Sequence, residues 1–303
     1  MSIIYDVIII GAGPGGISAA IYAKRAGLEV LLIEKAYVSG GQIINTAEVD
    51  NYPGIPGVSG MELANKFKEH AENVGVVSVR TEVVGIELEN EIKKIVTNDE
   101  QYLSKNIIIA TGATHRLLGI PGEMELAGMG VSYCATCDGA FFKDKTVAVI
   151  GGGDVAVEDA IFLARLCKKV YVVHRRDELR AAKVLQDRLL ALENVEMLWN
   201  QIPEAIHGAG QVEKIALKDV KSHIQQEVDI DGVFVAVGMT PQTETFKDIV
   251  AFDESGYIKA GEDCRTNVVG IYAVGDVRTK ALRQIITAAA DGANAITSIQ
   301  ADT

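Results

Sequence analysis

Two cysteines separated by two residues, Cys134 and Cys137, are the side chains of this sequence best placed for chemistry. This spacing lets both sulfurs share one helical turn, close into a small disulfide ring and tune each other's pKa. Asp138 follows directly, and partial burial would raise its pKa enough for it to exchange protons with the thiols. The pattern predicts thiol–disulfide exchange, with Asp138 either as acid and base or only as a cap before Gly139.

The other two cysteines, Cys167 and Cys264, each stand alone. A zinc site would need two more ligands at suitable spacing, so we expect no metal site. Four cysteines in a cytosolic chain do not suggest a structural disulfide framework either. We therefore expect Cys167 and Cys264 to be inert packing or surface thiols.

Two glycine-rich turns stand at matching positions in the two halves of the chain. Each follows an apolar run, 7–10 or 147–150, and leads into helix-forming residues, 19–23 or 157–166, which predicts strand, turn and helix. Such glycines permit a tight turn and let the backbone approach a pyrophosphate at the N-terminus of the helix. The fingerprint residues are Gly11, Gly13 and Gly16 in the first half and Gly151, Gly153 and Ala156 in the second.

The residues at the end of the next strand distinguish the two sites. In the first half this position is Glu34, whose carboxylate can accept hydrogen bonds from both hydroxyls of a ribose. In the second half it is His174, followed by Arg175, Arg176 and Arg180, whose guanidinium groups would bind a 2′-phosphate. The first half is thus predicted to bind FAD or NAD and the second NADP(H), unless the arginines only begin a solvated helix.

Length and composition fit two dinucleotide-binding domains. The repeat continues through apolar strands at 106–110 and 233–237, and 303 residues that are 48% hydrophobic can form about two cores. A net charge of −12 argues against nucleic acid as a partner. No apolar run reaches the length of a membrane span, and the first residues lack a signal-peptide pattern, so we expect a cytoplasmic protein.

The residues around the cysteine pair also carry a family resemblance. The segments 134–142 and 151–158 and the arginine group at 174–180 resemble the low-molecular-weight thioredoxin reductases of bacteria, which are flavoprotein pyridine nucleotide-disulfide oxidoreductases. The likeness spans nearly the whole chain. The sequence departs from the pattern at Val155, where the family usually has Ser, and at Gln242, where Asn is common.

The resemblance implies FAD in the first site, NADPH in the second, thioredoxin as the partner and a homodimer. Asp276 would meet the ribityl-phosphate region, and Arg283 and Gln284 would lie by the flavin ring. The cofactor-binding residues expected in this way, beyond those given above, are Gln42, Asn51, Asp276, Arg283 and Gln284 for FAD and Asp154 for NADPH.

A strand at 271–274 and an Ala-rich helix at 283–299 support a discontinuous first domain. We expect an α/β fold with two Rossmann-like domains, an FAD-binding domain of residues 1–115 and 245–303 and an inserted NADPH-binding domain of residues 116–244. The inserted domain carries the cysteines, so the resemblance implies that it rotates between two half-reactions, with hinges in the segments 112–132 and 238–246.

Several alternatives remain open at this level. The same chemistry could serve a glutaredoxin-like or peroxidase-linked carrier, or the protein could be a redox sensor without turnover. A ferredoxin-fed relative is a further alternative, although it would have no use for the arginine group. Phe141 and Phe142 are candidate docking aromatics or core residues, and Cys137, beside Asp138, is our choice for the cysteine on the flavin side.

Overall fold

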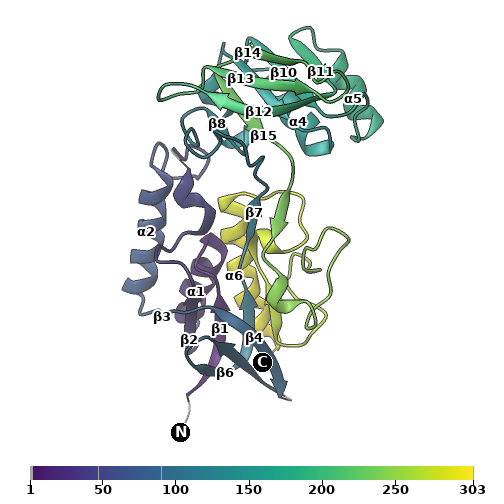
Figure 1. The fold of residues 1–303 in the computed structure, drawn as a ribbon. Helices are drawn as coiled ribbons and strands as arrows, with labels where there is room; N and C mark the ends of the chain where they lie inside the picture. The colour runs from purple at the N-terminus through teal and green to yellow at the C-terminus, as the bar shows by residue number, and fades with distance from the viewer. Residues whose placement is uncertain (1–2, 47, 90, 303) are drawn as a thin grey trace. The chain divides into compact units, whose positions relative to one another are not determined.

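The computed structural model describes residues 3–46, 48–89 and 91–302, and the chain divides into two compact units (Figure 1). Unit 1 consists of Met1–Thr114 and Thr240–Thr303, and unit 2 of His115–Met239. Unit 2 is therefore inserted between the two parts of unit 1.

Unit 1 is built on a sheet in the order β3-β2-β1-β6-β5-β4, with β17 also paired to β6. The pairs among β1, β2, β3, β6 and β17 are parallel, whereas β4, β5 and β6 form an antiparallel meander. The strands are β1 (Ile4–Ile10), β2 (Val30–Glu34), β3 (Val77–Arg80), β4 (Val83–Glu89), β5 (Ile92–Thr97), β6 (Gln101–Ile109) and β17 (Ile271–Ala273).

Apolar residues along β1 explain why it lies inside the sheet. Val7 and Ile9 enter the core under α1 and α6, while Ile8 and Ile10 enter the core on the opposite face. A strand buried on both faces needs such a continuous apolar run. The helices of unit 1 are α1 (Pro14–Arg25), α2 (Gly60–Asn73) and α6 (Ile285–Asp302), with 3-10 turns η1 (Gly41–Asn45), η3 (Glu244–Phe246) and η4 (Gly275–Val277).

Unit 2 repeats the parallel arrangement with the sheet order β11-β10-β9-β15-β8 and adds a small antiparallel sheet, β12-β13-β14. Its strands are β8 (Val131–Ser132), β9 (Thr146–Ile150), β10 (Lys169–His174), β11 (Val195–Trp199), β12 (Gln201–His207), β13 (Lys214–Asp219), β14 (Gln225–Asp229) and β15 (Gly232–Val235). Its helices are α3 (Ala135–Asp138), η2 (Gly139–Phe142), α4 (Asp154–Leu163) and α5 (Lys183–Leu190). The expected α/β fold is confirmed.

The two crossings between the units lie at β7 (Ala113–His115) and β16 (Met239–Pro241), which pair with each other. The second crossing comes before the expected limit at 244/245. Gln242 explains the difference, because its amide donates to the Gly112 carbonyl at 2.9 Å and its carbonyl accepts from Thr111 Oγ1 at 2.6 Å. These bonds hold the chain after Pro241 within unit 1.

Two helices begin and end at other residues than the sequence predicted. The helix expected at 157–166 is α4, which starts at Asp154 and ends at Leu163. The helix expected at 283–299 starts at Ile285, because the Gln284 amide donates to the Thr287 hydroxyl and stays outside the helix. Among the helices of the described residues, none is long and apolar enough to cross a membrane.

Candidate redox and nucleotide-binding sites

Cys134 and Cys137 form a disulfide, with their Cα atoms 5.3 Å apart. Cys134 is the N-cap residue of α3, and its carbonyl accepts the amides of Cys137 at 3.2 Å and Asp138 at 3.1 Å. This short helical turn brings the two sulfurs together, as the two-residue spacing predicted. The pair is thus built to open and close as a disulfide.

Asp138 contacts the cysteine segment through Ser132. The Ser132 hydroxyl donates to Asp138 Oδ2 at 2.5 Å and also accepts the Cys134 amide at 3.1 Å. Burial raises the pKa of Asp138, and the hydrogen bond from Ser132 offsets part of the increase. Within the described chain the Asp138 side chain makes no capping bond to η2, so its environment suits proton transfer better than capping.

Sequence reasoning missed Ser132, although a signal was present. A serine two residues before a backbone turn commonly bonds local backbone groups, and here it holds the Cys134 amide. The sequence does not reveal that the same hydroxyl also reaches Asp138.

A second missed group supports the residue before Cys134. The Tyr133 hydroxyl donates to Glu123 Oε1 at 3.1 Å, and the Glu123 carboxylate also accepts the backbone amides of 118–119. Glu123 is only 1% exposed, so these donors replace the water that it loses. His115 stacks on the Tyr133 ring with centroids 5.2 Å apart. Together they hold the chain that enters the redox segment.

Of the two candidate docking aromatics, Phe142 belongs to the core. It packs edge-on against Phe234 at 5.1 Å between centroids, and a Cβ on Gly232 would lie 2.2 Å from its ring. Of the two alternatives that the sequence left open for Phe142, docking or core, the structure therefore favours the core. Phe141 is 38% exposed and remains the candidate.

Cys167 and Cys264 are buried free thiols. Burial raises the pKa of Cys167 to about 11 and that of Cys264 to about 12. Both stay protonated at neutral pH, so neither is a nucleophile, which confirms the expectation of inert thiols. Among the described residues, no group of three or more His, Cys, Asp or Glu side chains could hold a metal ion.

The first glycine turn combines close packing with an open edge. Gly11 has a φ of +108°, and a Cβ there would lie 2.4 Å from the Ala110 carbonyl oxygen. A Cβ on Gly16 would lie 1.9 Å from the Gly11 oxygen. A Cβ on Gly13 would meet nothing within 4 Å, and in the described chain no side chain caps α1. The turn leaves room for an anion at the helix N-terminus.

Glu34 lies at this turn, as predicted. Its Oε2 accepts the Ala12 amide at 2.7 Å and its Oε1 the Ala36 amide at 2.8 Å. A carboxylate has about four acceptor sites, so two remain for ribose hydroxyls. A cavity of about 200 Å³ opens beside Glu34.

This cavity is also lined by residues that sequence reasoning missed. The guanidinium of Arg80 lies over the Tyr37 ring at 3.9 Å, and both line the cavity. The register of the parallel strands β2 and β3 sets Arg80 opposite Glu34, which brings Arg80 to the cavity. The stacked Arg80 and Tyr37 give a flat surface next to Glu34, the carboxylate predicted to bind the ribose hydroxyls. This arrangement suits an adenosine group.

Two further predicted residues are joined in unit 1. Asn51 donates through its side-chain amide to Gln284 Oε1 at 2.9 Å, although they are far apart in sequence. Gln42 donates instead to the backbone carbonyl of Ala113. Gln42 and Ala113 therefore contact each other beside the first crossing.

Asp276 and Arg283 hold buried polar atoms that lack a partner. Asp276 Oδ1 and Arg283 Nε are buried without a hydrogen bond within the part of the chain that is described. Burial also raises the pKa of Asp276, and the Arg283 guanidinium lies 4.0 Å from the Tyr257 ring centroid. Such atoms are rare in folded proteins, and a bound polar cofactor would satisfy them.

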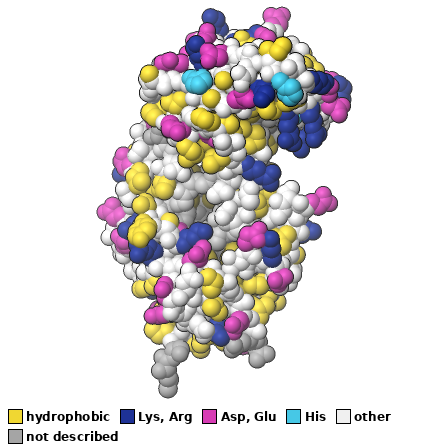
Figure 2. Space-filling model, viewed as in Figure 1, with side chains coloured by type: hydrophobic (Ala, Val, Ile, Leu, Met, Phe, Trp, Pro, Cys, Tyr) yellow, Lys and Arg dark blue, Asp and Glu magenta, His cyan; other side chains and the backbone are white. Residues whose placement is uncertain are grey.

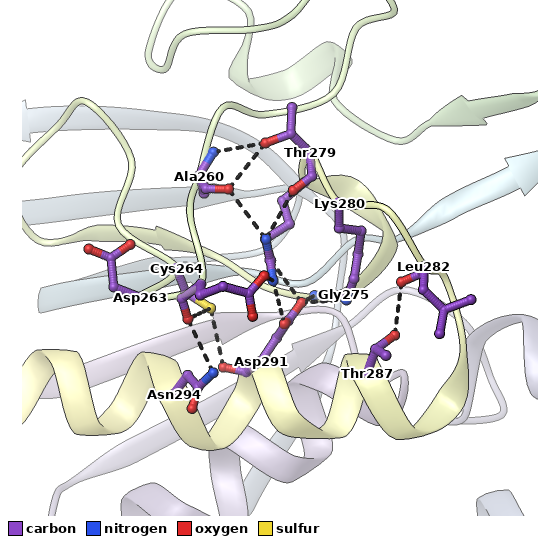
Figure 3. Close-up of polar contacts among 12 residues, drawn as sticks. Ala260, Asp263, Cys264, Gly275, Thr279, Lys280, Leu282, Thr287, Asp291 and Asn294 are labelled. Atoms are coloured by element: carbon purple, nitrogen blue, oxygen red, sulfur yellow. Dashed lines mark hydrogen bonds and ion pairs between the residues drawn. The ribbon is translucent and has the colours of Figure 1, made fainter.

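A buried ionic cluster supports the turn that carries Asp276 (Figure 3). Asp291, on α6, accepts the Gly275 amide at 2.8 Å, Arg278 Nη2 at 2.6 Å and Lys280 Nζ at 2.8 Å. Burial pushes the pKa of Asp291 upward, but the hydrogen bonds from Arg278 and Lys280 outweigh it and lower the pKa below 3.8. The charged carboxylate fixes Gly275, where η4 begins.

The second glycine turn resembles the first. A Cβ on Gly151 would lie 2.5 Å from the Ala236 oxygen and 2.6 Å from Ala156 Cβ, while a Cβ on Gly153 would meet nothing within 4 Å. The side chain of Asp154 accepts the Ala182 amide at 2.7 Å. Asp154 therefore anchors the segment after the arginine group to the start of α4.

His174 is packed inside, whereas the arginines face solvent. The His174 ring lies against Gly152, where a Cβ would come within 2.3 Å, and edge-on to Trp199. Its Nε2 is buried without a partner in the described residues, and burial lowers its pKa. The imidazole is therefore neutral at pH 7.

Arg175, Arg176 and Arg180 are all exposed, and none forms an ion pair with another described residue. The Arg180 amide donates to the Gly152 carbonyl at 2.8 Å, which brings this arginine back to the glycine turn. On the face in view, Figure 2 shows Lys and Arg side chains gathered on unit 2 beside α4 and α5. Unpaired guanidinium groups at the end of β10 fit a phosphate group.

Comparison with known proteins identifies the family of this chain. The family model for pyridine nucleotide-disulphide oxidoreductases matches residues 5–292. A thioredoxin reductase of Bacillus subtilis is 46% identical over 98% of this chain and 94% of its own. The solved thioredoxin reductase of Streptococcus pyogenes is 45% identical, with a TM-score of 0.95 over 99% of this chain and 98% of its own.

A second solved relative, the Lactococcus lactis thioredoxin reductase in a state titled the FR conformation, is 46% identical. It covers 98% of both chains and has a TM-score of 0.67. Identity of this extent over nearly the full length, together with the family match, decides the family. This chain belongs to the pyridine nucleotide-disulphide oxidoreductases.

Proposed function

We propose that this protein is a thioredoxin reductase that takes electrons from NADPH and delivers them to an oxidised thioredoxin through FAD and the Cys134–Cys137 pair. The observation that carries the proposal is the formed disulfide next to the half-buried Asp138. The strand after the first glycine turn ends at the acidic Glu34, and the strand after the second leads into Arg175 and Arg176. Relatives that share nearly half of its residues are named for this activity.

The residues of each unit fit one cofactor. FAD would be held in unit 1 by the turn Gly11–Gly16 and Glu34, with Gln42, Asn51, Asp276, Arg283 and Gln284 at its other end. NADPH would be held in unit 2 by the turn Gly151–Ala156, with Arg175, Arg176 and Arg180 at its 2′-phosphate. The buried His174 would support this turn through its contact with Gly152. When bound, these cofactors supply the electron pair that reduces the disulfide. Asp276 Oδ1 and Arg283 Nε gain the partners that they lack.

The cysteines and Asp138 would do the remaining chemistry. Addition of two electrons and two protons opens the Cys134–Cys137 bond, and Asp138 can protonate the departing thiolate. We assign Cys137 to the flavin side because it neighbours Asp138, and Cys134 to the attack on the carrier disulfide. Cys137 then resolves the mixed disulfide, which releases the reduced carrier and restores the Cys134–Cys137 bond.

The choice of NADPH over NADH gives the first test. Charge-assisted hydrogen bonds contribute roughly 1.5 to 3 kcal/mol each, so we expect the arginine group to favour NADPH by about 10² or more in kcat/KM. The double variant Arg175→Ala, Arg176→Ala should lose most of this preference through KM for NADPH, and its use of NADH should change little. Steady-state kinetics with both nucleotides measure the ratio.

A matched control separates local contact from net charge. Arg165→Ala, Arg188→Ala removes two arginines that line a separate groove between α4 and α5, so it should keep the NADPH preference. Equal kcat/KM for NADH and NADPH in the unmodified protein would overturn the assignment of the second site.

Movement of unit 2 is part of the proposal. The cysteine pair and the proposed NADPH residues all belong to unit 2, whereas the proposed FAD residues belong to unit 1. The cysteine pair and the nicotinamide must each reach the flavin in turn. Because both belong to unit 2, unit 2 has to move between the two half-reactions. The two solved relatives support this, because at nearly equal identity their TM-scores to this chain differ widely. The crossings at β7 and β16 are the proposed hinges.

Covalent trapping tests this movement. A crosslink that keeps the nucleotide site of unit 2 at the flavin should leave flavin bleaching by NADPH fast and stop carrier reduction. A crosslink that keeps the cysteine pair there should give the reverse in stopped-flow measurements. Reducing the crosslink should restore turnover, which serves as the control. Full turnover by either trapped form would refute the movement.

The carrier, the oligomeric state and the location remain predictions. Thioredoxin is preferred as the carrier because the relatives are named for it, and a glutaredoxin-like or peroxidase-linked protein is the alternative. We propose a homodimer in the cytoplasm. Size-exclusion chromatography with light scattering would reject the homodimer if it gave the mass of one chain.

A further inference from the structure

An acidic residue directly follows the arginines that are proposed to bind the 2′-phosphate. Asp177 comes next after Arg176, and its side chain is 68% exposed. A carboxylate at this place would repel a phosphate dianion and weaken the attraction of the neighbouring guanidinium groups. A cation that cancels the charge of Asp177 would therefore strengthen NADPH binding.

Lys221 supplies such a cation from another part of unit 2. Lys221 lies on the turn between β13 and β14, and its Nζ is 2.7 Å from Asp177 Oδ2 in the loop after β10. The hydrogen bond from Lys221 lowers the pKa of Asp177, so the carboxylate is ionised at neutral pH and the pair is a true ion pair.

The turn that carries Lys221 is ordered by its own hydrogen bonds. Asp219 Oδ1 accepts the amides of Lys221 at 2.8 Å and Ser222 at 2.7 Å, and Asp219 Oδ2 accepts from Gln201 Nε2 at 3.1 Å. His223 closes the turn in the left-handed region, with a φ of 60°. The lysine is thus presented by a built turn rather than by a flexible loop.

One residue joins this turn to the arginine loop. The Asn200 amide donates to the Arg176 carbonyl at 3.2 Å, and the Asn200 carbonyl accepts the Val220 amide at 2.7 Å. Asn200 has a φ of 57°, a backbone conformation that Asn adopts more readily than most residues. Asn200 therefore holds the backbone at Arg176, next to Asp177, close to the backbone at Val220, next to Lys221. These bonds stabilise the contact between Lys221 and Asp177.

We propose that Lys221 is a specificity-determining residue for the 2′-phosphate of NADPH, and that it acts by neutralising Asp177. This inference rests on the proposed NADPH site in unit 2. Lys221 is a positioning residue in this account, because its effect passes through Asp177 and needs no contact of its own with the nucleotide.

Calorimetric titration of the flavin-loaded protein with adenosine 2′,5′-bisphosphate and with AMP tests the proposal without turnover. Lys221→Ala should weaken binding of the bisphosphate about five-fold, the upper range for an exposed charge contact, and change AMP binding by less than about two-fold. Lys221→Arg should restore the affinity. Lys214→Ala, which breaks the exposed Lys214–Glu227 pair of the same small sheet, is the matched control and should have no such effect.

A double-mutant cycle with Asp177→Asn decides the route of the effect. In the Asp177→Asn background, Lys221→Ala should cost less than about two-fold, because no carboxylate remains to be neutralised. An undiminished loss there, or an unchanged affinity of Lys221→Ala in the unmodified background, would overturn the inference. If the unmodified protein bound the bisphosphate and AMP equally, the NADPH site itself would be wrong, so the two failures are distinguishable.

Discussion

Replacement of either Cys134 or Cys137 by Ser is expected to abolish reduction of an oxidised carrier while NADPH still bleaches the bound flavin. The two sulfurs form one disulfide on α3, so a single serine removes the only redox pair among the described residues. Flavin bleaching needs neither sulfur. Stopped-flow absorbance of the flavin reports the first half-reaction, and steady-state NADPH oxidation with carrier reports the whole cycle.

Cys167→Ala is the matched control. Cys167 is a buried thiol with a pKa raised to about 11, so its removal should leave both half-reactions intact. Substantial carrier turnover by either serine variant would show that the Cys134–Cys137 pair is not the relay. Loss of flavin bleaching in both variants would show instead that the cysteines also support the nucleotide step.

Asp138→Asn is expected to slow the thiol–disulfide steps by about 10² to 10⁴, the usual contribution of a positioned acid or base. Burial raises the pKa of Asp138, so its acid form persists to higher pH than that of an exposed aspartate. A step that uses this acid should slow as pH rises through the raised pKa, and the Asn variant should lack this titration. Flavin bleaching by NADPH should be unchanged.

Ser132→Ala provides an independent check of the same titration. The Ser132 hydroxyl donates to Asp138 and lowers its pKa against the effect of burial. Its removal should move the titration to higher pH and keep most of the rate. A pH profile of carrier reduction that is identical in the unmodified protein and in Asp138→Asn would favour a purely structural role for Asp138.

Features that depend on residues close together in the sequence could be predicted. The disulfide depends on a two-residue spacing within one turn, and the nucleotide turns depend on apolar runs followed by glycines that permit a positive φ or close packing. Glu34 and His174 were found because both end the strand after such a turn. The boundaries of α4 and α6 were less accurate, since they depend on single hydrogen bonds such as Gln284 to Thr287.

Contacts between side chains of different elements could not be predicted. The pair of Arg80 and Tyr37 depends on the register of β3 against β2, and that of Lys221 and Asp177 on the β13–β14 turn. The choice between docking and core stayed open for Phe142 because the sequence does not reveal the neighbouring Phe234. Each needs the sheet order, which one sequence leaves open.

Consumption of NADPH by the flavin-loaded protein, with and without oxidised thioredoxin, tests the central claim most directly. The same assay should include a glutaredoxin-like and a peroxidase-linked carrier at equal concentration. The account predicts rapid oxidation of NADPH with thioredoxin, one thioredoxin disulfide reduced per NADPH, and only slow oxidation without a carrier. Failure of thioredoxin to accelerate NADPH oxidation above the rate without carrier, while the flavin is still bleached, would contradict it.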